Sequence, residues 1–203
     1  MLSSFTYNRL FSVLFLCFIT IFVFAQTGKN SFHRFSKISS FALINVKQEK
    51  SARIIANDKP LSLFVFLSPE CPLCQNYTRT LKQLREKYKK QVNCYGVIPG
   101  NAYTIKEVAD FKNKYTINFD LFIDTKQNLT HYLNATVTPQ VVLINNKGSL
   151  VYTGAIDDWV QAIGKKRLQV SQHYVNDAIE QSLQPAIVKI KATNAIGCKI
   201  NDY

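Results

Sequence analysis

The sequence has only one closely spaced cysteine pair, Cys71-Pro72-Leu73-Cys74, and only three histidines, which are dispersed at His33, His131 and His173. A structural zinc ion needs about four nitrogen, oxygen or sulfur ligands, and the chain offers no second pair to complete such a set. We therefore predict no zinc site. The 203 residues also contain no internal repeat and no low-complexity segment, so one domain with a single core is expected.

Acidic residues are also few, because 13 Asp and Glu stand against 25 Lys and Arg, for a formal net charge of +12. Such a charge could favour an anionic partner. The basic residues are scattered along predicted helices, however, and the chain lacks the Gly-aromatic motif of an RNA-binding sheet. We therefore predict no nucleic-acid partner. With 47% hydrophobic and 19% charged residues, the chain is expected to fold rather than to be disordered.

The N-terminal apolar run is short for a membrane span. It extends from Leu10 to Phe24 and ends at Val23-Phe24-Ala25, a small-residue cleavage site, whereas a spanning helix needs about 20 apolar residues. We interpret residues 1–25 as an export signal to the periplasm or the exterior; an uncleaved membrane anchor is the alternative, and the only membrane link expected. In either case disulfides can persist among the remaining cysteines, which are Cys71, Cys74, Cys94 and Cys198.

The rest of the chain divides into a tether (26–40), a domain (41–184) and a tail (185–203) that carries Cys198. Within the domain, buried-looking apolar runs alternate with amphipathic stretches, which predicts a parallel or mixed sheet flanked by helices. The expected strands are 41–46, 53–55, 61–67, 92–98, 120–123, 137–144 and 150–152, and the expected helices are 71–88, 105–115, 127–133 and 170–183.

The cysteine pair opens the first of these helices. A cysteine at a helix start lies among unpaired N–H groups and at the positive end of the helix dipole, so Cys71 is favoured as a thiolate, while the acidic neighbour Glu70 opposes this. Pro72 suits a first helical turn. Cys71 can attack a substrate disulfide, and Cys74, one turn on, can then attack the mixed disulfide. This spacing predicts thiol-disulfide exchange without a cofactor, with a purely structural disulfide as the alternative.

The two remaining cysteines have different surroundings. Cys94 lies inside an apolar run, where a free cysteine behaves as a small buried hydrophobe. Cys198 lies on the tail and has three alternatives: it can pair with Cys94, reach Cys71 as a third redox thiol, or remain an exposed thiol.

Motifs spread over most of the chain share one resemblance. They are the apolar run 61–67, the segment 68–74 with sequence Ser-Pro-Glu-Cys-Pro-Leu-Cys, Phe119 to Asp124, Thr138-Pro139 and the hairpin at Gly148. Together they resemble the redoxin branch of the thioredoxin superfamily, which includes alkyl hydroperoxide reductases and thiol-specific antioxidant proteins. The resemblance implies a thioredoxin-like α/β fold with a central mixed sheet, flanking helices, and a C-terminal helix and tail.

The resemblance also implies roles for Thr138 and Pro139. In the superfamily the proline at the position of Pro139 follows a cis peptide bond and lies against the active-site sulfurs, while the preceding backbone pairs with the bound substrate. The closing Gly197-Cys198-Lys199-Ile200 is similar to exported bacterial redoxins that end in a Gly-Cys-x-Ile motif. Some of these keep only the first cysteine of the pair, so the likeness supports Cys71 more firmly than Cys74 and makes Cys198 a candidate additional redox thiol.

These features predict an extracytoplasmic thiol-disulfide oxidoreductase that acts on protein thiols or disulfides and exchanges electrons with a redox partner protein. The first alternative is a peroxiredoxin-like antioxidant peroxidase. Its frame, Pro-x-x-x-Thr-x-x-Cys, is incomplete here, because Ser68 stands for the threonine and Phe64 for the proline. The second alternative is a copper(I) carrier that uses soft thiolates, but such carriers use Cys-x-x-x-Cys with a distant histidine, and no histidine neighbours Pro139.

Overall fold

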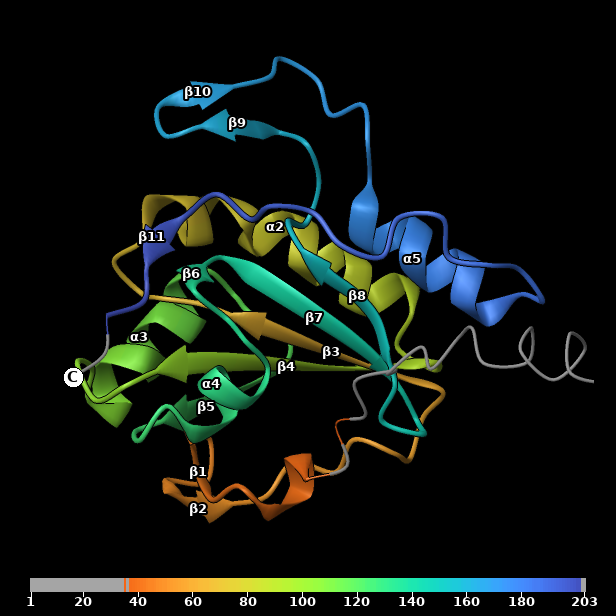
Figure 1. Cartoon of the computed structure of the whole chain (residues 1–203). Coiled ribbons are helices and arrows are strands. Elements are labelled where there is room, and N and C mark those ends of the chain that lie inside the picture. Colours follow the sequence, from red (N-terminus) through yellow and green to blue (C-terminus); the bar gives the residue numbers. More distant parts are fainter. Residues whose placement is uncertain (1–34, 36, 202–203) are drawn as a thin grey trace, which may run out of the picture. The chain divides into compact units, whose positions relative to one another are not determined.

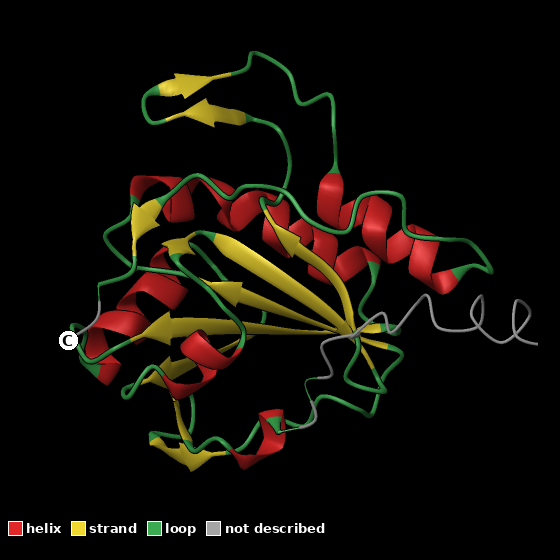
Figure 2. Cartoon of the chain, in the orientation of Figure 1, coloured by secondary structure: helices red, strands yellow, loops and turns green. Residues whose placement is uncertain are grey.

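The computed structural model describes residues 35 and 37–201, so the predicted export signal at 1–25 and most of the tether lie outside the described residues. Within 37–201, no helix combines the length and apolar character needed to cross a membrane. The described part of the chain contains a central seven-stranded sheet with helices packed against it, as Figure 1 and Figure 2 show.

The sheet is mixed, as the sequence predicts. Its strand order is β2-β1-β5-β4-β3-β7-β8, with β3, β4 and β5 mutually parallel and the other neighbours antiparallel. The strands are β1 (Leu43–Asn45), β2 (Lys50–Ala52), β3 (Leu61–Phe66), β4 (Val92–Pro99), β5 (Asp120–Asp124), β6 (Val137–Thr138), β7 (Gln140–Asn145), β8 (Leu150–Gly154), β9 (Val160–Ala162), β10 (Lys165–Lys166) and β11 (Cys198–Lys199). The helices are η1 (Ile38–Ser40), α2 (Pro72–Lys87), α3 (Ile105–Lys114), α4 (Asn128–Tyr132) and α5 (Tyr174–Leu183).

Strand β3 is buried on both faces because its residues are apolar on both faces. Leu63 and Val65 face a core layer that contains buried residues of α2, α3 and α5. Phe64 and Phe66 face the opposite layer, which contains buried residues of α4 and of the N-terminal described segment. The strand ends near the start of α2, so the central strand carries the chain directly to the cysteine pair (Figure 1).

Helix α2 packs through the face that its sequence period predicts. Cys74, Tyr77 and Leu81 are buried and belong to the same core layer as Leu63 and Val65. The exposed side chains lie on the opposite face of the helix, as expected for an amphipathic helix on a sheet. This packing fixes the position of the first helical turn and of both cysteines in it.

Two predicted elements are corrected by the structure. The expected strand 53–55 is wrong, because the strand is β2 and it ends at Ala52; Ile54 is buried in the second core layer from a loop, while Ile55 is exposed. The expected single strand 137–144 is broken at Pro139 into β6 and β7, because proline has no N–H to donate to a strand ladder.

The last helix is shorter than the expected 170–183, and a hairpin precedes it. The last helix begins at Tyr174 rather than at residue 170, and β9 pairs with β10 in a small separate sheet. Asp158 holds the returning segment: its carboxylate accepts hydrogen bonds from the backbone N–H groups of Ser171 at 2.8 Å and Gln172 at 3.1 Å, and its Oδ2 lies 3.1 Å from Arg167 Nε.

Because Asp158 accepts these hydrogen bonds as a carboxylate, the free energy of unfolding is expected to fall at low pH. Burial opposes ionisation of Asp158, but the bonds from Ser171 and Gln172 outweigh it and lower the pKa of Asp158 to about 2. A carboxyl whose folded pKa is depressed stabilises the fold above its unfolded pKa, and that stabilisation is lost as pH falls from about 4 to about 2. We expect Asp158→Asn to reduce the loss of unfolding free energy between about pH 5 and about pH 2.5, measured by urea denaturation.

The control for this prediction is Asp110→Asn. Asp110 is an exposed acid paired with Lys106 on α3, so its substitution should leave the acid dependence of the wild type in place. An Asp158→Asn protein with an unchanged acid dependence would contradict the assigned role of this carboxylate.

Candidate functional site

Cys71 lies at the junction between β3 and α2. It is the N-cap residue of α2, with an extended backbone (φ −74°, ψ 115°), and Pro72 opens the helix. Cys71 N donates to Ser68 O at 3.2 Å, and Gln75 N donates to Cys71 O at 3.1 Å, so the backbone passes directly into the first turn. The Cys71 side chain makes no capping hydrogen bond, which leaves its sulfur available for covalent chemistry beside the positive end of the helix dipole.

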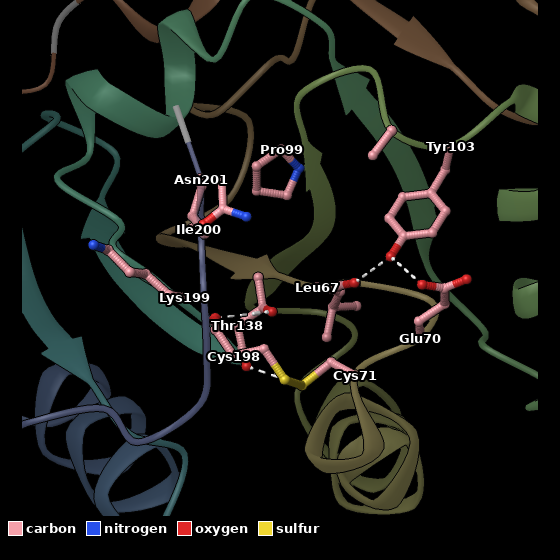
Figure 3. Close-up of a pocket in the computed structure, with 12 residues that line it drawn as sticks. Leu67, Glu70, Cys71, Pro99, Tyr103, Thr138, Cys198, Lys199, Ile200 and Asn201 are labelled. Atoms are coloured by element: carbon pink, nitrogen blue, oxygen red, sulfur yellow. Dashed lines mark hydrogen bonds between the residues drawn. A yellow bond between two sulfur atoms is a disulfide. The ribbon is translucent and has the colours of Figure 1, made fainter. Parts of the chain in front are cut away.

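Cys71 Sγ forms a disulfide with Cys198 Sγ, and the two Cα atoms are 6.2 Å apart, within the usual range for such a bond. Figure 3 shows this bond at the end of the α2 helix, with the tail passing beside it. Of the three alternatives for Cys198, the structure has the one in which it reaches Cys71. Cys71 is only 2% exposed in this arrangement.

Cys74 is not the disulfide partner of Cys71 in this structure. Of the cysteines in the described part of the chain, Cys74 and Cys94 are free. Cys74 is fully buried, and its Sγ accepts a hydrogen bond from Ser68 N at 3.4 Å. Burial raises the pKa of the Cys74 thiol to about 12, although the Ser68 N–H works in the opposite direction. Near neutral pH Cys74 is therefore a thiol, the less nucleophilic form.

The backbone of Thr138 lies against the same sulfur, directly before Pro139. The Thr138–Pro139 peptide bond is cis, which confirms what the family resemblance implied. Thr138 O lies 3.2 Å from Cys71 Sγ, and Figure 3 shows Thr138 beside the disulfide. Strand β6 pairs antiparallel with β11, so that Thr138 is opposite Cys198. The backbone that the resemblance assigns to a substrate is thus paired with the chain's own tail.

The tail is held at two places before and after Gly197. Upstream, Thr193 N donates to Thr153 O at 3.0 Å, which ties the tail to β8. Downstream, Ile200 N donates to Thr136 O at 2.9 Å, which continues the pairing beyond β11. The segment predicted only as a tail is therefore an extended arm that runs back from the end of α5, past β8, to the cysteine pair (Figure 1).

A pocket opens beside the disulfide. Its walls include Ser68, Glu70 and Tyr103 on one side and tail residues 198–201 on the other. Tyr103 Oη lies 2.9 Å from Ser68 Oγ and donates to Glu70 Oε2 at 3.4 Å. Burial raises the pKa of Tyr103, so its hydroxyl remains a hydrogen-bond donor at neutral pH. Glu70 is exposed, and water therefore screens its charge from Cys71.

Cys94 is separate from this group. It lies on β4, packs against the core, and burial raises the pKa of its thiol to about 12. Its side chain is half-buried rather than fully buried as the sequence predicts, and it packs against the core as a small hydrophobe. Among the described residues, no group of three or more His, Cys, Asp and Glu side chains is placed to hold a metal ion.

The residues of the cysteine pair and of the Thr138–Pro139 turn fall within a recognised sequence family. Residues 36–153 match the AhpC/TSA family. The chain belongs to the AhpC/TSA family. This family is the redoxin branch that the motifs resemble, and at this level the chain is an oxidoreductase of the redoxin type. The matched residues end before the tail, so the family assignment does not extend to Cys198.

Solved structures show the same fold at low sequence identity. An uncharacterised conserved protein from Geobacillus kaustophilus is 21% identical, with a TM-score of 0.72 over 79% of this chain and 87% of that one. A hypothetical protein from Sinorhizobium meliloti is 22% identical, with a TM-score of 0.68 over 79% and 89%.

A secreted disulfide oxidoreductase of Mycobacterium tuberculosis, described as homologous to Escherichia coli DsbE, is 17% identical, with a TM-score of 0.50 over 57% of this chain and 83% of that one. Among curated proteins, no sequence matches the chain. These likenesses establish the thioredoxin-like fold for this AhpC/TSA chain.

Proposed function

We propose that the chain is an exported thiol-disulfide oxidoreductase in which Cys71 is the attacking thiol. The observation that carries this proposal is the Cys71–Cys198 disulfide at the N-terminus of α2, next to the Thr138 carbonyl. A sulfur at that position is favoured as a leaving group and as a nucleophile by the helix dipole. Exchange through such a sulfur needs no cofactor, because both steps are displacements at sulfur.

The second step has two candidate thiols. The spacing of the motif favours Cys74, one turn along α2, whereas Cys198 is the thiol bonded to Cys71 in this structure. Thr138 and Pro139 would bind the polypeptide that carries the substrate cysteine. The substrates would be protein thiols or disulfides, and a redox partner protein would restore the starting state of the cysteines.

Export is supported by two observations. The apolar run before Ala25 has the form of a cleavable signal, and a protein of similar fold, that of Mycobacterium tuberculosis, is described as secreted. Outside the cytoplasm, the Cys71–Cys198 disulfide would persist in the absence of a dedicated reductant. An uncleaved N-terminal anchor would place the same domain at a membrane surface.

Reduction of insulin by dithiothreitol tests the role of Cys71. The wild type should accelerate the precipitation of the insulin B chain, and Cys71→Ser should lower the rate to that of dithiothreitol alone, because serine is not a competent nucleophile for disulfides at neutral pH. Cys94→Ala, which changes a thiol outside the site, should keep the wild-type rate. Equal rates for the wild type and Cys71→Ser would refute the proposal.

Peroxide reduction is the second candidate function, because the family includes thiol-specific antioxidant proteins. Phe64, which takes the place of the frame's proline, lies in the middle of β3 and faces the core layer opposite to Cys71. It therefore adds nothing to the surroundings of the Cys71 sulfur. Faster oxidation of reduced Cys71 by one equivalent of peroxide than by one equivalent of a peptide disulfide would favour the peroxidase.

A further inference from the structure

The tail occupies the place that a substrate strand would take. β11 pairs with β6 so that Cys198 lies opposite Thr138, and its sulfur is bonded to Cys71. A peptide paired with β6 in the same register would bring its own cysteine to the position of Cys198. Since one strand edge can pair with only one partner, the tail and such a peptide exclude each other.

We infer that Cys198 is the resolving thiol of the redox centre, and that docking of the tail on β6 and release of the substrate peptide are a single event. This inference rests on the proposed role of Cys71 as the attacking thiol. It assigns to Cys198 the attack on the mixed disulfide, the step for which the motif spacing favoured Cys74. The substrate class is an extended peptide segment with a disulfide-bonded cysteine, which binds by strand addition to β6.

The two steps balance as displacements at sulfur. With the tail away from β6, the Cys71 thiolate attacks a substrate disulfide, forms a Cys71–substrate disulfide and releases the other substrate sulfur as a thiolate. The tail then returns, and the Cys198 thiolate attacks Cys71 Sγ, forming the Cys71–Cys198 bond and releasing the substrate thiolate. The substrate gains two electrons and the cysteine pair loses them. A dithiol reductant restores the pair, and the same steps in reverse oxidise a substrate dithiol.

The tail is shaped to dock closely at this point. A Cβ atom on Gly197 would overlap the carbonyl group of Thr138, so this close approach of the two backbones requires glycine directly before Cys198. Thr138 Oγ1 lies 3.5 Å from Cys198 O, and Gln127 Nε2 donates to Asn201 O at 2.7 Å beyond it. The tail therefore makes close contacts with the domain both before Cys198, at Gly197, and after it, at Asn201.

Cys74 and Cys198 differ in their freedom to move. Cys74 is fully buried on the face of α2 that packs in the core with Tyr77 and Leu81, so its sulfur moves only with that helix. Cys198 lies on a partly exposed arm beside Lys199, which is exposed. An arm that leaves and returns can expose Cys71 to a peptide without unpacking the core, whereas Cys74 has no comparable path.

The test is a single turnover of the reduced full chain with a symmetric peptide disulfide. The probe is the disulfide dimer of N-acetylated Gly-Cys-Lys-Ile, in which attack at either sulfur gives the same adduct. Acid quenching and mass spectrometry follow the protein–peptide adduct, and the released peptide thiol is quantified.

The wild type should form the adduct transiently, release two peptide thiols per protein and end with the Cys71–Cys198 bond. Cys198→Ser should release one peptide thiol and retain the adduct, while Cys74→Ser should behave as the wild type.

The outcomes separate the inference from the proposed function. Resolution of the adduct at the wild-type rate in Cys198→Ser, or retention of the adduct in Cys74→Ser, overturns the role of Cys198 and leaves Cys71 as the attacking thiol. Absence of an adduct in every protein with an intact Cys71, or thiol release by Cys71→Ser at the wild-type rate, overturns the proposed function itself.

A second variant keeps the thiol and disturbs only the docking. Gly197→Val retains Cys198 but places a side chain against the Thr138 carbonyl, so the adduct should persist about tenfold longer or more, since a misplaced reacting group loses rate steeply. Ala192→Val is the matched control, because Ala192 lies on the same tail with an exposed side chain; its adduct should decay at the wild-type rate. An unchanged decay in Gly197→Val would contradict the coupling of docking to release.

Discussion

Brief alkylation of the reduced, folded protein at about pH 8 should label Cys71 and Cys198 about 1,000-fold or more faster than Cys74 and Cys94. The alkylating agent reacts with the thiolate, and burial raises the pKa of Cys74 and of Cys94 to about 12. At about pH 8 only about one such thiol in 10,000 is ionised. Reduction breaks the bond between Cys71 and Cys198, and in the proposed cycle the tail then leaves β6 and exposes both thiols. Iodoacetamide labelling followed by peptide mapping measures the four rates.

The same experiment in a denaturant provides the control. In about 6 M guanidinium chloride the burial is removed, and the four cysteines should react at rates within about tenfold of one another. In the oxidised, folded protein, mapping should recover Cys71 linked to Cys198. Labelling of Cys74 in the folded protein as fast as Cys198 would contradict the described burial and would also restore Cys74 as an accessible second thiol.

Phe64→Ala should lower the free energy of unfolding by about 3–5 kcal/mol. Phe64 is fully buried on the central strand, and its ring centroid lies 5.5 Å from that of Tyr95 on β4. Removing the ring loses its transfer free energy and leaves a cavity that the two neighbouring strands, β4 and β7, hold open. Urea denaturation of the oxidised protein measures the change through the midpoint at an unchanged slope.

Ile163→Ala is the control for that change. Ile163 is 73% exposed in the hairpin between β9 and β10, so its truncation should alter the free energy of unfolding by no more than about 0.5 kcal/mol. If both variants were destabilised equally, the assignment of Phe64 to the core would be wrong. Because Phe64 faces away from Cys71, the folded Phe64→Ala protein should retain the exchange rate of the wild type.

The central elements could be predicted because their signals are local. The run that became β3 is apolar at every position, and the period of α2 places Cys74, Tyr77 and Leu81 on one face. Burial of a strand on two faces or of a helix on one face leaves that pattern in the sequence. The cysteine pair at the helix start follows from the same two elements, so the location of Cys71 was predictable as well.

The partner of Cys71 was not predictable in this way. β11 is two residues long, and its pairing with β6 joins residues about 60 positions apart, such as Thr138 and Cys198. Two residues show no period, and no local signal specifies a distant strand edge. The spacing of the motif therefore favoured Cys74, while the closing Gly-Cys-x-Ile likeness was the one available indication of Cys198. Ile54 was misassigned for a similar reason: it is buried although it lies in a loop, and in the sequence such an apolar residue cannot be told from one in a strand.

The bond between Cys71 and Cys198 closes a loop across a sequence separation of 127 residues, which contains every described element from α2 to α5. In the chain-entropy account, closing a loop of that size restricts the denatured ensemble by about 5 kcal/mol relative to the open chain. By thermodynamic linkage, the folded domain resists reduction of this bond by the same free energy by which the bond resists denaturation. Reduction of the bond would therefore lower the free energy of unfolding, and the oxidised form would be the more stable of the two.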